Sequence, residues 1–143
     1  MIGREEIMGY KREKNFKGVV LEEILTFLSE KANFNIIKLP SKKIDKIAVD
    51  SSIDSESEDI VKLLIRGSSF NLKKCLPVVG KVIKPFYLFL DEEILLYAKI
   101  RQLKFKEQKK KLDKFKDFLD EFEEKHPEVK RAIVNSLLKL YKK

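Results

Sequence analysis

The hydrophobic positions in the first half of the chain alternate between a helical and a strand-like period. Residues 19–31 are predicted to form a helix because their apolar positions recur on one face, at Val20, Leu21, Ile24, Leu25 and Leu28. Residues 34–39, between Asn33 and Pro40, predict a strand, and residues 44–49 predict a second one. The few apolar residues in 1–14 do not decide between a short helix and a strand.

A second helix is predicted from Ser55 to Arg66. Ser55 and Glu58 have the spacing of a capping box, in which each side chain bonds a free amide of the first turn. Gly67 then stands where a left-handed residue commonly ends a helix. Three strand-like runs follow, over residues 70–72, 76–79 and 82–90.

The pattern changes at Asp91, after which no Gly or Pro occurs until Pro127. This predicts one basic helix of about 30 residues, followed by a terminal helix that pairs with it as an antiparallel hairpin. The predicted fold class is α+β: a small two-helix α/β sandwich followed by a C-terminal helical hairpin. The predicted domains are residues 1–90, an α/β docking-type domain, and residues 91–143, the long basic helix plus the terminal helix.

The 143 residues carry a formal charge of +8, and most of the cations are lysines. A composition rich in Lys and Glu is typical of a thermophile and equally of an AT-rich genome. The charge permits contact with nucleic acid, but acidic residues are interspersed through much of the chain. We therefore interpret the lysines first as a solvated surface, with nucleic-acid binding as the alternative.

The strongest candidate for polyanion binding is the segment between residues 104 and 116. Its seven lysines surround the predicted helix and would neutralise several phosphates: Lys104, Lys106, Lys109, Lys110, Lys111, Lys114 and Lys116. The absence of Arg from this window argues against bidentate recognition of bases.

No set of residues in the sequence predicts catalysis, a cofactor or a metal ion. Cys75 is the single cysteine and is interpreted as a small buried residue, and His126, the single histidine, is interpreted as a cap or an exposed side chain. The acidic residues from Asp50 to Asp59 are interpreted as a solvated loop and helix cap, with a divalent-cation or phosphorylation site as the sharper alternative. No small-molecule substrate is evident, and the prediction is that the protein is not an enzyme.

No run of 18 uncharged apolar residues occurs, so no membrane span is predicted. The sequence starts Met1-Ile-Gly-Arg without the apolar region of a signal peptide. The expected location is cytoplasmic, or periplasmic if a leader has been removed.

Residues 12–90 resemble the short N-terminal domain of secretins and TonB-dependent receptors. The resemblance rests on the leucine-rich helix after Asn15, on Asn33-Phe-Asn-Ile-Ile-Lys-Leu-Pro40, and on Ile60-Val-Lys-Leu-Leu-Ile-Arg-Gly-Ser-Ser-Phe-Asn-Leu72. It implies a non-catalytic docking domain that pairs with another subunit, or with itself, in a secretion or receptor system. The predicted function is therefore protein–protein interaction or assembly, with nucleic-acid binding through the lysine-rich segment as the alternative.

Overall fold

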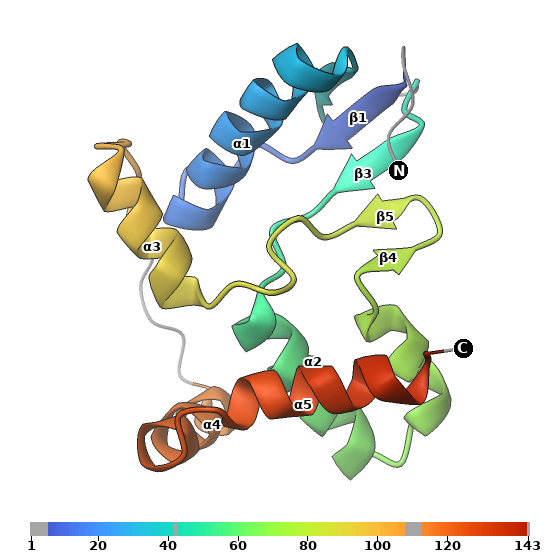
Figure 1. Cartoon of the computed structure of the whole chain (residues 1–143), viewed down its shortest axis with the longest axis vertical. Coiled ribbons are helices and arrows are strands. Elements are labelled where there is room, and N and C mark those ends of the chain that lie inside the picture. The colour runs from blue at the N-terminus through green and yellow to red at the C-terminus, as the bar shows by residue number, and fades with distance from the viewer. Residues whose placement is uncertain (1–5, 42, 108–112, 143) are drawn as a thin grey trace.

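The computed structural model describes residues 6–41, 43–107 and 113–142. Five short strands in this part of the chain form one sheet in the order β2-β1-β3-β5-β4 (Figure 1). β1, β2, β3 and β5 run parallel, and β4 pairs antiparallel with β5. The strands are β1 Ile7–Tyr10, β2 Asn35–Lys38, β3 Lys46–Ala48, β4 Val78–Val79 and β5 Val82–Ile83.

β1, in the segment whose sequence pattern did not decide between helix and strand, is an interior strand of the sheet. It pairs with β2 on one side and β3 on the other. Met8 and Tyr10 are almost fully buried, and a Cβ on Gly9 would lie 3.0 Å from atoms of Leu39 and Ile44. The local signal is weak because β1 is only four residues long and includes Gly9, so it lacks the longer apolar run that is typical of a strand buried on both faces.

α1 (Phe16–Ala32) confirms the first predicted helix and forms the crossover between β1 and β2. Its first turn is capped by Asn15, whose Oδ1 accepts from the Gly18 amide at 2.8 Å. α1 packs on α3 (Asp91–Ile100) and the sheet. Together they bury a first core that includes Met8, Leu21, Leu25, Phe34 and Ala98.

α2 (Ile53–Ile65) is present, but it begins before the predicted capping box. Ser52, not Ser55, is the cap, and the Ser55 amide points to its Oγ at 3.4 Å. The earlier start buries Ile53 in a core, and this burial outweighs the local capping preference of Ser55.

Residues 70–72, predicted as a strand, lie in the 3₁₀ helix η1 (Ser69–Cys75). Side chains three apart in a 3₁₀ helix lie on the same edge. Leu72 and Cys75 therefore both reach the core, which an extended strand with alternating faces would not achieve.

The predicted 30-residue helix is wrong for the described part of the segment. α3 ends at Ile100, and Gln102 has a positive φ of 55°. Residues 103–107 are not helical, and the next helix is α4 (Lys114–Lys125). Breaking the helix lets Leu103 and Phe105 pack on the first core, where Phe105 meets Phe16 edge to face.

α5 (Val129–Leu140) lies along α2 and contacts α4, as the predicted hairpin requires (Figure 1). It closes a second core with α2 and η1, which includes Ile60, Leu72, Val134 and Leu137. The α+β class is thus confirmed. Each core contains residues from before and from after position 90. The division into domains 1–90 and 91–143 stays a prediction. None of the described helices is long and apolar enough to cross a membrane.

Candidate functional site

A crevice of about 460 Å³ opens at the carboxyl ends of the parallel strands. Lys11 follows β1, Leu39 follows β2, and Val49 and Asp50 follow β3, and all four line it. The chain order reverses at β1, because β2 and β3 lie on opposite sides of it. In parallel α/β sheets this reversal is the place where ligands bind. The crevice is therefore the first candidate for a small-molecule site.

The charges in this crevice do not favour a phosphate. Glu13 and Asp50 line it with a single cation, Lys11, which is already paired with Glu13 at 3.0 Å. The α1 N-terminus, where a helix would hold an anion, is capped by Asn15. A Cβ on Gly18 would collide with the carbonyl oxygen of Glu13, so the loop after β1 lies directly on that first turn. The crevice suits a neutral or cationic group better than an anion.

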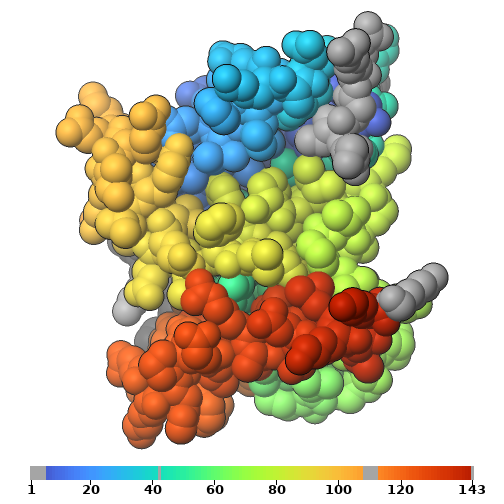
Figure 2. Space-filling model, in the orientation of Figure 1, coloured from blue at the N-terminus to red at the C-terminus, as the bar shows by residue number. Residues whose placement is uncertain are grey.

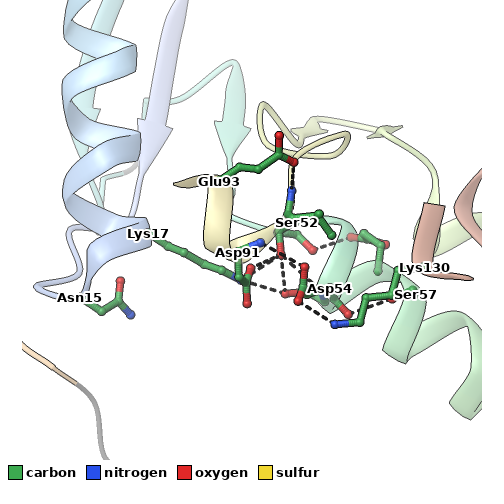
Figure 3. Close-up of polar contacts among 12 residues, drawn as sticks. Asn15, Lys17, Ser52, Asp54, Ser57, Asp91, Glu93 and Lys130 are labelled. Atoms are coloured by element: carbon green, nitrogen blue, oxygen red, sulfur yellow. Dashed lines mark hydrogen bonds and ion pairs between the residues drawn. The ribbon is translucent and has the colours of Figure 1, made fainter. Parts of the chain in front are cut away.

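A second polar cluster joins the first turns of three helices (Figure 3). Lys17 of α1 places its Nζ 2.8 Å from Asp91 Oδ1 of α3, and 3.1 and 3.0 Å from the hydroxyls of Ser52 and Ser55 at the start of α2. The Asp91 amide donates to Asp54 Oδ1 at 3.0 Å. Asp54 and Asp91 stand in the first turns of their helices, where the helix dipole stabilises negative charge.

Lys130 of α5 completes this polar junction, which we define as Lys17, Ser52, Ser55, Asp54, Asp91 and Lys130 with the α4 carboxylates Asp120 and Glu123. The Lys130 side chain is 3% exposed, and its Nζ lies 2.8 Å from Asp54, 2.7 Å from Asp120 and 3.2 Å from Glu123. Burial disfavours the ammonium, but the hydrogen bonds and charges of Asp120 and Asp54 outweigh it and raise the pKa of Lys130. Lys130 therefore stays protonated and cannot act as a base.

In the described part of the chain the junction borders two spaces, and the larger, of about 350 Å³, is lined in part by Asp54, Asp91, Asp120, Glu123 and Lys130. The cavity that Lys17, Asp54 and Lys130 line measures about 90 Å³, roughly the volume of three waters. The junction holds two ammonium groups and four carboxylates, each bonded to a partner in the same set or to a neighbouring amide. This arrangement joins α1 and α3 of the first core to α2 and α5 of the second.

The predicted polyanion-binding lysines do not form one surface on a continuous helix. Lys104 and Lys106 lie in the non-helical segment beside α1, where the Lys106 amide donates to the Lys14 carbonyl at 2.7 Å. Lys114 and Lys116 lie in the first turn of α4, next to its cap Asp113. Lys109, Lys110 and Lys111 lie outside the described residues. That these lysines bind a polyanion stays a prediction.

The acidic stretch from Asp50 to Asp59 is largely occupied by contacts within the protein. Asp54 pairs with Lys130, Glu56 with Lys84 at 2.8 Å, and Glu58 with Lys62 at 2.7 Å. Among the described residues no group of three or more His, Cys, Asp or Glu side chains is arranged to hold a metal ion. His126 is exposed at the end of α4, with its ring 4.9 Å from that of Phe122.

Cys75 is buried, and its environment keeps the thiol neutral. Burial raises the pKa of Cys75 to about 11, and the nearby carboxylates of Glu56 and Asp59 contribute. The pKa of a cysteine in an unfolded chain is about 8.5. Because the pKa is higher in the folded state, the stabilisation is complete below pH 8.5 and is lost as the pH rises toward 11.

We expect the free energy of unfolding to fall by roughly 2 kcal/mol between pH 8.5 and 10.5 on account of this thiol. Urea titrations at both pH values measure it. A Cys75→Ala variant should show a smaller fall, retaining the part due to Tyr87, whose pKa is also raised by burial and by Glu56. Identical falls in wild type and variant would contradict the assignment.

No protein-family model matches the sequence, and no curated protein is significantly similar to it. Solved structures do match. The U34-tRNA thiolase NcsA from Methanococcus maripaludis, with its [4Fe-4S] cluster, superposes with a TM-score of 0.73 at 15% sequence identity. The match covers 96% of this chain and 72% of the thiolase chain. At this identity the likeness concerns the fold.

This match overturns the resemblance to secretin and TonB-receptor domains, because it includes the C-terminal helices that the resemblance left unexplained. The motifs behind the resemblance were short and apolar, and many helix–strand units satisfy them. The prediction of a non-enzymatic docking module is also contradicted, since the fold over nearly the whole chain is one that an enzyme uses.

The residues of this chain do not fit a [4Fe–4S] cluster like that of the thiolase. Such clusters are held mainly by cysteine thiolates, and this chain has one cysteine. That cysteine is buried in the second core, and its pKa of about 11 keeps it a thiol. We therefore assign no step of any reaction to a cluster bound by this chain.

Proposed function

We propose that this protein is an enzyme of tRNA modification that binds tRNA directly and does not use an iron–sulfur cluster held by its own cysteine. The observation that carries the proposal is the likeness of 96% of the chain to the fold of a tRNA thiolase. The charge of +8 supports it, because a basic protein gains affinity for RNA by releasing counterions from phosphates.

The crevice at the carboxyl ends of β1, β2 and β3 is the proposed place of the small co-substrate. Its position follows the rule for parallel sheets. Its walls combine the apolar side chains of Leu39 and Val49 with the polar groups of Asn15 and Asp50. Such a mixture orients a small ligand through a few polar contacts in an otherwise apolar pocket.

The first test is binding of a fluorescent tRNA transcript, followed by anisotropy between 50 and 300 mM KCl. We expect micromolar or tighter binding at 50 mM KCl and a clear loss of affinity as the salt increases. A duplex DNA of similar charge is the control and should bind at least about tenfold more weakly. Equal binding of both, or no tRNA binding at 50 mM KCl, would overturn the proposal.

The second test is nucleoside mass spectrometry of tRNA from source cells with and without the gene. Loss of one modified nucleoside is expected, and its return should require the intact gene. An unchanged set of modified nucleosides in the deletion strain would argue against a role in tRNA modification.

A further inference from the structure

The longest stretch without an acidic residue lies between Asp59 and Asp91. It contains six cations: Lys62, Arg66, Lys73, Lys74, Lys81 and Lys84. Lys62 pairs with Glu58, and Lys84 pairs with Glu56. The other four have no carboxylate within ion-pair distance among the described residues. Residues 60–90 thus contribute four cations whose charge no acidic residue of the same stretch offsets.

η1 displays part of this charge on an exposed edge. Leu72 and Cys75 turn into the second core, whereas Phe70, Lys73 and Lys74 are exposed. Phe70 and Lys73 are three residues apart, so they lie on the same edge of the 3₁₀ helix. Phe70 is 77% exposed, the highest value among the large hydrophobic side chains described. An exposed aromatic ring beside unpaired cations is a combination that proteins use to bind single-stranded nucleic acid.

The C-terminal end of α5 adds two more cations to this region. Leu138 and Tyr141 pack against the core cluster that holds Leu72 and Cys75, and Figures 1 and 2 place the end of α5 beside η1. Lys139 and Lys142 are exposed there. No acidic residue follows Glu128 in the sequence. We call the combined region the η1 surface and define it as Arg66, Phe70, Lys73, Lys74, Lys139 and Lys142.

The chemistry of the η1 surface matches single-stranded RNA. Lysines bind phosphates without reading sequence. An exposed aromatic ring stacks on an unpaired base, a contact worth about 1–3 kcal/mol. RNA recognition favours loops and ends, where bases are free to stack in this way. In the first turn of α4, by contrast, Lys114 and Lys116 lie beside Asp113 and Asp117. These carboxylates weaken the positive electrostatic potential that would attract phosphates.

We propose that the η1 surface binds an unpaired segment of the RNA substrate, with Phe70 stacked on a base and the surrounding cations on phosphates. This inference rests on the proposed function, since it assumes that RNA is bound at all. The wild-type tRNA titration tests that assumption separately. If wild type does not bind tRNA, the proposed function fails; if wild type binds and the variants below bind equally well, only this inference fails.

The stacking is tested with Phe70→Trp, because the chain contains no tryptophan and the new indole is the only one. We expect its fluorescence to be quenched by at least about 30% on saturation with a tRNA transcript at 50 mM KCl. Phe27→Trp is the matched control: Phe27 is 56% exposed on α1, away from η1 (Figure 1). An unquenched indole in the saturated complex of the Phe70→Trp variant, or equal quenching in the Phe27→Trp variant, would overturn the proposal.

The charges are tested by Lys73→Glu with Lys74→Glu. We expect at least a tenfold loss of tRNA affinity and a salt slope reduced by about 1.4–1.8. Lys31→Glu with Lys38→Glu is the matched control, since both lysines are exposed on other elements and the net charge changes equally. Circular dichroism establishes that each variant is folded. Equal losses in the two double variants, or a larger loss from Lys114→Glu with Lys116→Glu, would contradict the η1 surface as the binding site.

Discussion

Replacing Lys130 by Ala is expected to lower the free energy of unfolding by about 3–5 kcal/mol. Removing one partner of a buried ion pair leaves the other charges without compensation, which costs about this much. The Lys130 side chain is 3% exposed and its Nζ contacts three carboxylates, of Asp54, Asp120 and Glu123. Asp120 is 45% exposed and can turn to water, so the loss arises mainly from the other two.

Urea denaturation at pH 7 measures this effect. Lys139→Ala, on the exposed side of the same helix, is the control and should change stability by no more than about 0.5 kcal/mol. Lys130→Met retains much of the buried volume, so a similar loss in that variant assigns the effect to charge rather than to a cavity. The loss should shrink toward pH 4, because burial raises the pKa of Glu123 and its protonation removes one of the unpaired charges. A loss below about 1 kcal/mol at pH 7 would show that the junction is not a strong connection between the cores.

Replacing Gly18 by Ala is expected to destabilise the protein by about 2–3 kcal/mol. In an ordinary helix the same change stabilises by up to about 1 kcal/mol. Here a Cβ would collide with the carbonyl oxygen of Glu13 and lie 2.8 Å from its carbonyl carbon. Because these are backbone atoms, the loop between β1 and α1 must move, and overpacking of this kind costs about 1–3 kcal/mol.

The same urea measurement tests Gly18→Ala. Gly67→Ala is a useful comparison, because Gly67 has a φ of 71° and open space around it, so its cost of about 1 kcal/mol comes from backbone strain alone. Gly18→Ala should also displace Lys11 and Glu13 in the crevice, since both belong to the loop that moves. A Gly18→Ala protein as stable as wild type would mean that the loop does not rest on α1 as the structure has it.

The elements that the sequence predicted well are those whose own residues carry a complete pattern. α1, α2 and α5 have apolar stripes, and β2 is bracketed by Asn33 and Pro40. β1 carries only four residues with a glycine among them, and its strand conformation comes from neighbours that arrive 28 or more residues later in the chain, at Asn35 and Lys46. The pattern of apolar and polar residues within β1 cannot predict pairing with strands so distant in the sequence.

The candidate sites were harder to predict than the fold, for the same reason. Lys130 and Asp54 stand 76 residues apart, and nothing near either of them signals the pair. The end of α3 is a similar case: Leu103 continues the helical stripe of Ile94 and Ile100 in the sequence, but the packing of Leu103 and Phe105 on the first core, where Phe105 meets Phe16, favours leaving the helix. One feature of the sequence indicates the crevice: the polar residues Lys11 and Asp50 stand at or just after the ends of apolar strands. This feature predicts a site only when those strands are known to be parallel and adjacent.

The strand order also bears on how the protein avoids aggregation. It leaves β2 and β4 as the two edge strands of the sheet. The outer N–H and C=O groups of an edge strand can hydrogen-bond to a strand of another molecule. β4 is two residues long, and β2 ends at Lys38, with Pro40 two positions on. Short edge strands that carry or adjoin a charged residue and a proline are poor templates for the addition of another strand. The protein should therefore remain dispersed at concentrations where a sheet with long, flat borders would form fibres.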